Sequence, residues 1–173
     1  MARIPLVDSD APDSRLAPVF SLFTDAGREV PELYRVLGNA PQLLKAWTDL
    51  AWPLRHEASI PRGLRELAIV RVAQLTGATY EWRAHVPAAL KFGVTQEVLD
   101  HLDDWPSLDG LGDTEREILA FTDQLTMNLR VSDETFSAVA ARWTSAEIVE
   151  LTLTVAFYSC VSRVLNALDI TAD

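Results

Sequence analysis

The sequence has a single cysteine, Cys160, among its 173 residues. One thiol cannot form an intrachain disulfide, a CxxC redox couple or a cysteine-rich zinc site. Cys160 lies in the apolar stretch Ala-Phe-Tyr-Ser-Cys-Val. Because free cysteine in such surroundings usually behaves as a small hydrophobic residue, we expect it to be buried.

Basic residues are also scarce, with 15 Lys and Arg against 25 Asp and Glu and a formal net charge of −10. They are scattered and form no stripe that could follow a phosphate backbone, so we expect no nucleic-acid partner. The N-terminal segment lacks the continuous apolar core of a signal peptide, and the apolar stretches are interrupted well short of a membrane span. The sequence therefore predicts a cytoplasmic protein without membrane contact.

The sequence shows no run of alternating apolar and polar residues that would indicate a strand, whereas apolar residues recur at helical spacing almost throughout. With 49% hydrophobic residues the chain is long enough for a core and short enough for one domain. We predict an all-α, single-domain helical bundle over residues 1–173, with residues 1–12 as an N-terminal arm.

Prolines, glycines and capping residues predict where the helices begin and end. Proline is tolerated in a first helical turn, and Thr114 with Glu117 and Thr144 with Glu147 fit the capping-box pattern. The last helix is apolar on nearly every face, as a central buried helix is. The acidic stretch Asp103–Asp113 is either a linker or a surface excursion. The predicted helices are Ser14–Ala26, two segments that begin at Pro31 and Pro41, one from Pro61 to about Thr76, Ala78–Phe92 closed by Gly93, Gln96–Asp103, one after Thr114, and Ser145–Ala167.

One face of the predicted helix 78–92 combines ionisable and apolar residues. Glu81 and His85 lie one turn apart on a stripe that otherwise holds Ala78, Ala89 and Phe92. The opposite side carries two cations, Arg83 and Lys91, and is the expected solvated face. Glu81 and His85 are therefore predicted to point inward.

Glu66 repeats this pattern on the preceding helix, where its stripe continues through apolar residues. A buried carboxylate is costly unless it is paired, and an imidazole or a proton-sharing acid across the helical hairpin would pair it. Glu66, Glu81 and His85 would then form a proton-transfer site. Two other interpretations stay open: an ordinary surface pair of Glu81 and His85 at i, i+4, and a metal site with these three residues as ligands.

The residues of this hairpin resemble a known signature. Arg65-Glu66-Leu67-Ala68-Ile69-Val70, then Tyr80-Glu81-Trp82-Arg83-Ala84-His85, then Phe92-Gly93-Val94 are similar to the carboxymuconolactone decarboxylase and alkylhydroperoxidase D superfamily. In that pattern a glutamate precedes a CxxC and a histidine follows the second cysteine by four residues. Glu66 and His85 take the glutamate and histidine positions, whereas Ala78 and Glu81 stand where the two cysteines would be.

This departure decides which chemistry the resemblance implies. Thiol peroxidase chemistry is disfavoured, because both cysteines of the pair are replaced. The cysteine-free branch implies a lyase or isomerase that needs no cofactor, resembling carboxymuconolactone decarboxylase, for a small anionic unsaturated lactone or carbonyl compound. The resemblance also implies a homo-oligomer, either a trimer or a hexamer. No cofactor and no metal are assigned.

The roles implied for individual residues divide into catalysis and binding. His85 is the expected proton donor and acceptor, Glu81 tunes it and Glu66 shares its proton network. The residues expected to bind substrate are Arg62, Tyr80, Trp82 and Tyr158. Two alternatives remain: a repurposed enzyme of specialised metabolism that performs dehydration, cyclisation or hydrolysis, and a non-catalytic oligomeric binding protein.

Overall fold

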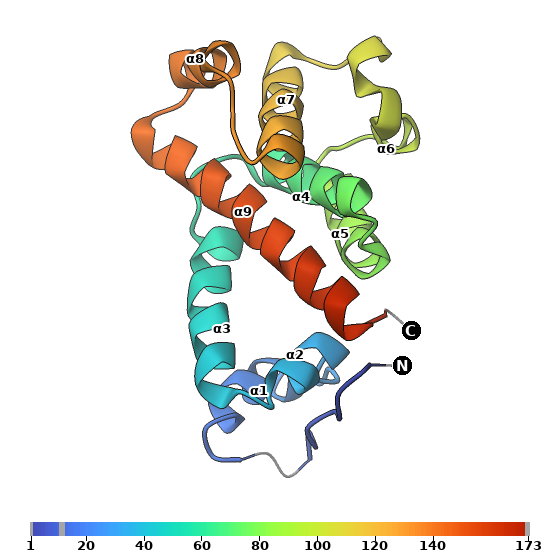
Figure 1. Ribbon diagram of the computed structural model, residues 1–173, viewed down its shortest axis with the longest axis vertical. Helices are drawn as coiled ribbons and strands as arrows, with labels where there is room; N and C mark the ends of the chain where they lie inside the picture. The colour runs from blue at the N-terminus through green and yellow to red at the C-terminus, as the bar shows by residue number, and fades with distance from the viewer. Residues whose placement is uncertain (1, 11–12, 172–173) are drawn as a thin grey trace. The chain divides into compact units, whose positions relative to one another are not determined.

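The computed structural model describes residues 2–10 and 13–171, and within these ranges all regular structure is helical (Figure 1). The all-α prediction is confirmed. The chain divides into two compact units, Met1–Glu57 with Leu165–Asp173, and Ala58–Val164. A single domain over the whole chain stays a prediction.

The first unit contains helices α1 (Ala17–Thr24), α2 (Glu32–Leu37) and α3 (Pro41–His56). Proline stands at the start of each, as expected from its fixed φ and missing N–H. Helix α1 is shorter at both ends than the predicted Ser14–Ala26.

The N-terminal arm is anchored to the first unit by its backbone. The amide of Arg3 donates to the carbonyl of Leu168, and the amide of Val7 donates to the carbonyl of Arg35. The side-chain amide of Asn39 donates to the carbonyl of Pro5 at 2.8 Å. The described part of the predicted 1–12 arm is thus extended chain held by hydrogen bonds, while residues 1, 11 and 12 lie outside the described ranges.

The second unit is built around helix α4, which packs against α5 and α7. Nine consecutive residues of α4, from Arg65 to Ala73, are buried, so every face of its middle turns meets a neighbour. The helices of this unit are α4 (Arg62–Thr76), α5 (Thr79–Lys91), α6 (Gln96–Asp100), the 3-10 helix η1 (Leu102–Ser107), α7 (Asp113–Asn128), α8 (Asp133–Arg142) and most of α9 (Ser145–Leu168).

The α4–α5 hairpin depends on glycine at its two ends. Gly77, which ends α4, has a φ of 64°, a left-handed conformation that side chains disfavour. Gly63, at the start of α4, lies against the end of α5, where a Cβ would be 2.4 Å from the carbonyl oxygen of Phe92. The hairpin that carries Glu66 and His85 therefore closes tightly only because residue 63 has no side chain.

We expect Gly63→Ala to destabilise the protein by about 1–3 kcal/mol, because the added methyl group forces two backbones apart. The measurement is the free energy of unfolding in urea. Gly112→Ala is the matched control, since a Cβ there meets only the Glu115 carboxylate, at 3.4 Å. Equal stability of the two variants would contradict the close-approach argument.

The acidic stretch 103–113 is a packed surface excursion. Its first half forms η1, Leu102 and Leu111 are buried, and the indole Nε1 of Trp105 donates to Asp123 at 3.0 Å. The capping box predicted at Thr114 is wrong: Gly112 is the N-cap of α7, and its amide donates to Glu115. The box at Thr144 and Glu147 is confirmed by their hydrogen bonds.

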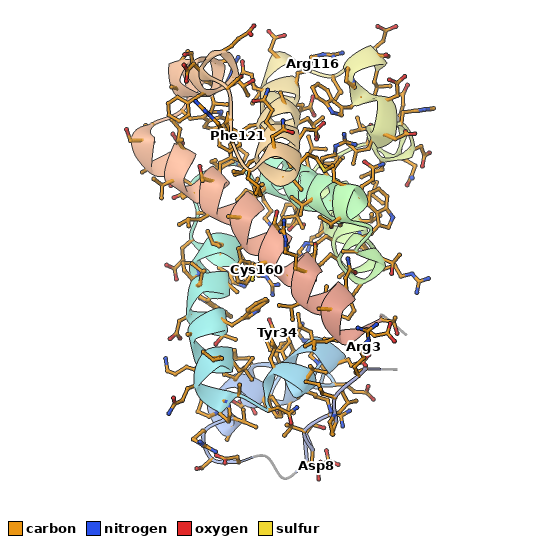
Figure 2. All side chains as sticks on the ribbon, in the orientation of Figure 1. Arg3, Asp8, Tyr34, Arg116, Phe121 and Cys160 are labelled. Atoms are coloured by element: carbon orange, nitrogen blue, oxygen red, sulfur yellow. The ribbon has the colours of Figure 1, made fainter. Side chains whose placement is uncertain are left out.

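Helix α9 differs from the predicted central buried helix, because one stripe along it is exposed. Val149 and Leu153 are exposed, and Cys160 is exposed too (Figure 2), so the prediction of a buried cysteine is wrong. By length and composition α9 would suffice to cross a membrane, and half of its apolar window is buried. Core helices of soluble proteins have the same properties, so this is weak evidence for a span.

Candidate functional site

The predicted ionisable residues meet in the interior of the second unit. His85 on α5 approaches two carboxylates, with Nδ1 at 2.7 Å from Oε2 of Glu66 and Nε2 at 3.2 Å from Oε2 of Glu81. All three side chains are buried. The prediction that Glu81 and His85 face inward and that Glu66 is buried is confirmed.

The two contacts of His85 are not equivalent. The Glu66 contact is a hydrogen bond, whereas the Glu81 oxygen lies within ion-pair distance of Nε2 but off the direction that a hydrogen bond requires. Among the described residues, this buried oxygen of Glu81 accepts no hydrogen bond. Buried polar atoms normally have a partner. The partner of Glu81 Oε2 is therefore Nε2 of His85, at an ion-pair distance of 3.2 Å.

Arg62 completes the site from the first turn of α4. Its Nε donates to Oε1 of Glu66 at 2.6 Å, so each oxygen of Glu66 is held by a different cationic side chain. The Arg62 side chain is 24% exposed to solvent, whereas the Glu66 side chain is fully buried. Its guanidinium also lies over the ring of Phe92, 5.7 Å from the centroid. Arg62 is thus the part of the site that solvent can reach.

Tyr158 of α9 packs directly on the imidazole. The two ring centroids are 4.9 Å apart with an interplanar angle of 85°, an edge-to-face contact. Tyr158 is fully buried. It fixes the plane of the His85 ring and limits the directions from which another molecule can approach it.

Two opposing effects set the pKa values of the buried pair. Burial alone would lower the pKa of His85, but the hydrogen bond to Glu66 and the negative charges of Glu81 and Glu66 raise it above its ordinary value. Burial alone would raise the pKa of Glu66, but the hydrogen bond and charge of His85, together with Arg62, lower it. Both shifts favour the charged forms of the pair, an imidazolium beside a carboxylate.

These directions predict a pH-dependent stability. His85, with a raised pKa, stabilises the fold fully below its ordinary value of 6.5 and loses this contribution as the pH rises through its folded value. Glu66, with a lowered pKa, stabilises the fold above its ordinary value of 4.5 and loses this contribution as the pH falls through its folded value. The pair therefore contributes most between these two ordinary values.

We expect the difference in free energy of unfolding between the wild type and His85→Gln to be largest near pH 5–6 and to shrink towards alkaline pH. Urea titrations of both proteins from pH 5 to pH 9 measure it. Taking the difference cancels the titration of all groups that the two proteins share. Parallel pH profiles would contradict the assignment of the imidazolium.

The structure places the other predicted binding residues differently. Trp82 packs against the core cluster around Leu67 and Val70, and Tyr80 is half-buried on the first turn of α5. Arg71, another cation of α4, makes a bidentate ion pair with Asp123 at 2.6 and 2.8 Å. A substrate contact for Trp82 and Tyr80 stays a prediction.

Sequence reasoning missed Phe92 as a neighbour of the site. The predicted inward stripe of α5 included it as an apolar residue, yet its ring is 46% exposed and lies beneath Arg62 and Lys91. The spacing that placed it on the stripe of His85 was correct. Its exposure follows from its position in the C-cap of α5, where the covering helix has ended.

The metal alternative has little geometric support. Within the described residues, no group of three His, Cys, Asp or Glu side chains is arranged to hold a metal ion. Both ring nitrogens of His85 face carboxylates and its pKa is raised, whereas a metal ligand must be a neutral imidazole with a free lone pair.

An all-helical core with a glutamate and a histidine paired across a helical hairpin defines the class of this protein. Its sequence matches the carboxymuconolactone decarboxylase family over residues 41–124. The match, which covers just under half of the chain, and the shared fold make the chain similar to the superfamily of carboxymuconolactone decarboxylase and alkylhydroperoxidase D-like proteins.

Several relatives share this fold at low sequence identity. The uncharacterized protein YdfG of Bacillus subtilis is 28% identical over 116 residues, 66% of this chain and 78% of YdfG. The alkylhydroperoxidase AhpD core of a peroxidase-related protein from Ralstonia eutropha superposes with a TM-score of 0.83 at 18% identity, covering 99% of this chain and 92% of that one. The debrominase Bmp8 superposes with a TM-score of 0.80 at 22% identity, covering 98% and 90%.

Proposed function

We propose that this protein is an acid/base catalyst that needs no cofactor, a lyase or isomerase acting on a small anionic unsaturated lactone or carbonyl compound. The observation that supports the proposal most is the buried imidazole of His85 between the carboxylates of Glu66 and Glu81, with the guanidinium of Arg62 at the solvent side. A buried, charge-perturbed pair beside an accessible cation is typical of a site for proton transfer to an anion.

In the proposed reaction Arg62 binds the carboxylate of the substrate. When the scissile carbon–carbon bond breaks, carbon dioxide leaves and its bonding electrons stay on the substrate as a dienolate. His85 then donates its Nε2 proton to the carbon, which neutralises the charge of the dienolate and leaves a neutral imidazole. The next proton from solvent recharges His85, so the cycle consumes one proton and no oxidant or reductant.

Glu66 and Glu81 have different roles in this scheme. Glu66 holds Nδ1 and keeps a proton there, which fixes Nε2 as the atom that exchanges protons with the substrate. Glu81, whose Oε2 has no hydrogen-bond partner among the described residues, would accept a hydrogen bond from a substrate hydroxyl beside Nε2. Both carboxylates favour the imidazolium form and so make it a weaker acid than a free imidazolium.

Two further features support a small substrate and disfavour thiol chemistry. Ala78 and Glu81 occupy the positions of the cysteine pair, and Cys160 lies on the exposed side of α9. A cysteine-to-alanine variant of the debrominase Bmp8 has been solved with 2,3,4-tribromopyrrole, with a TM-score of 0.80 to this chain. That ligand is a small flat ring, and we propose a substrate of similar size.

The test is turnover of γ-carboxymuconolactone in D₂O, followed by NMR, with carbon dioxide release measured in parallel. We expect the product to carry deuterium at the carbon that loses the carboxylate, because the proton of His85 exchanges with solvent. A chelator in the assay should change nothing. Absence of turnover by the wild type would refute this substrate, and turnover that disappears with the chelator would refute the cofactor-independent scheme.

We also propose that the protein acts as a cytoplasmic homo-oligomer, a trimer or a hexamer. Exposed apolar side chains on α9, among them Val149 and Leu153, would be covered by such an assembly. Light scattering of the purified protein measures the mass directly. A monomer at micromolar concentration would contradict this proposal without affecting the proton-transfer scheme.

A further inference from the structure

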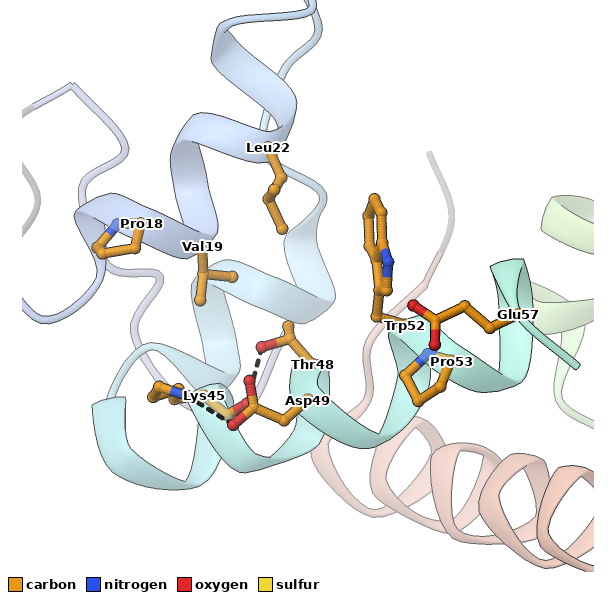
Figure 3. A pocket seen from close by; sticks show the side chains of 9 residues that line it. All are labelled: Pro18, Val19, Leu22, Lys45, Thr48, Asp49, Trp52, Pro53 and Glu57. Atoms are coloured by element: carbon orange, nitrogen blue, oxygen red, sulfur yellow. Dashed lines mark hydrogen bonds and ion pairs between the residues drawn. The ribbon is translucent and has the colours of Figure 1, made fainter.

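A cavity lies in the first unit, between α1 and α3, and its residues have no part in the His85 site. It has a volume of about 560 Å³, within the range of small-molecule sites (Figure 3). Residues from α1, from α3 and from the C-cap of α3 line it. They are Pro18, Val19, Leu22, Lys45, Thr48, Asp49, Trp52, Pro53 and Glu57.

The apolar part of the cavity is lined by hydrophobic side chains that are partly exposed to solvent. Leu22 is 44% exposed and Trp52 is 49% exposed, and both face the cavity together with Val19 and two proline rings. His56 packs on the indole of Trp52, with ring centroids 4.2 Å apart. This contact limits the rotation of the indole, so Trp52 presents a flat, electron-rich surface to the cavity.

The side chains that line the cavity carry a net negative charge. Lys45 and Asp49 neutralise one another through an ion pair of 2.6 Å. Glu57 supplies a further carboxylate, and among the described residues its side chain has no hydrogen-bond or ion-pair partner. Figure 3 shows this carboxylate beside Trp52 and Pro53.

The end of α3 adds to this negative potential. Glu57 is the C-cap of a helix of 16 residues, where unsatisfied carbonyl groups carry partial negative charge. Pro53 lies inside the same helix and has no N–H, so the carbonyl of Asp49 lacks its usual donor four residues further along. A cation at this end of the cavity would be stabilised by Glu57, the helix end and the indole face together.

We propose that this cavity binds a small organic cation, an ammonium group carried on a flat apolar body, as in an arylalkylamine. The ring of the ligand lies against Leu22 and Trp52, and its ammonium group approaches the Glu57 carboxylate. The size of the cavity fits one such molecule. The two carboxylates against one lysine exclude an anionic ligand, so the cavity is a separate site from the one proposed at Arg62 and His85.

The test uses three probes of similar size: 2-phenylethylamine as the cation, 2-phenylethanol as the neutral compound and 3-phenylpropionate as the anion. Calorimetric titration at pH 8 and moderate salt gives their affinities for the full-length protein. We expect the amine to bind at least tenfold more tightly than the alcohol, and the anion to show no binding. Equal affinity for the amine and the alcohol would overturn the role of Glu57, and preference for the anion would overturn the proposal.

Substitutions locate the site. Glu57→Gln should weaken amine binding at least fivefold and leave the alcohol unchanged, and Trp52→Ala should weaken both. Two variants are the controls. Glu29→Gln removes the same charge from an exposed loop, and Leu43→Ala removes an exposed apolar side chain of α3 that does not line the cavity. Amine binding that survives Trp52→Ala in a protein with unchanged circular dichroism would refute this cavity as the site.

Discussion

Glu66→Ala is expected to destabilise the second unit by about 3–5 kcal/mol, which is the largest effect on stability that we predict for a single residue. The carboxylate is fully buried, and its two oxygens are held separately by Arg62 and His85. Its removal leaves His85 buried without its hydrogen-bond partner and leaves a void next to the imidazole. Urea unfolding at pH 6, where the pair contributes fully, measures the loss.

A matched pair of amide variants separates the charge of Glu66 from its volume. Glu66→Gln keeps the shape of the side chain and is expected to cost less than Glu66→Ala, about 1–3 kcal/mol. Glu97→Gln makes the same chemical change on the exposed surface of α6 and should leave the free energy of unfolding within about 0.5 kcal/mol of the wild type. If Glu66→Gln behaves like Glu97→Gln, the buried ion pair contributes nothing to stability.

The position of this site was predictable because helical periodicity is a local property. Glu81 and His85 are one turn apart, and the composition of the remaining stripe told which face of α5 is buried. Glu66 followed from the same reasoning on α4. The contact between the two helices required only that a hairpin with a short glycine-containing turn brings their buried faces together.

Features that depend on packing between distant segments were not predictable in the same way. The apolar composition of α9 indicated full burial, but composition does not tell how many neighbours a helix has, and Cys160 faces outward. The N-cap of α7 is Gly112, whose amide meets Glu115, whereas the sequence pattern favoured Thr114. Glycine provides no side-chain signal, so a polar residue two positions later fitted the pattern better.

The position of Arg62 was only partly predictable from the sequence. Its distance of four residues from Glu66 predicts a contact on one face of α4, and the contact is present. Its stacking on Phe92 depends on the close approach of two helix ends at Gly63, and this approach could not be deduced from spacing. The same glycine therefore determines both the tightness of the hairpin and the position of the cation in the proposed site.

His85→Gln is expected to reduce turnover by about 10²- to 10⁴-fold, the usual contribution of a positioned acid–base group. Glutamine can keep a hydrogen bond to Glu66 but cannot carry a titratable proton. Deuterium incorporation at the reacting carbon should disappear together with carbon dioxide release. His101→Gln, which changes an exposed histidine at the end of α6, is the control and should retain full activity.

The comparison of activity with stability then separates catalysis from a structural role. If His85→Gln remains folded at pH 8, where the imidazolium contributes less to stability, and loses turnover there, the loss arises from chemistry and not from unfolding. Full activity of the folded variant would refute His85 as the proton carrier. Glu81→Gln distinguishes the two carboxylates further: because its Oε2 has no hydrogen-bond partner among the described residues, we expect this change to affect turnover more than stability.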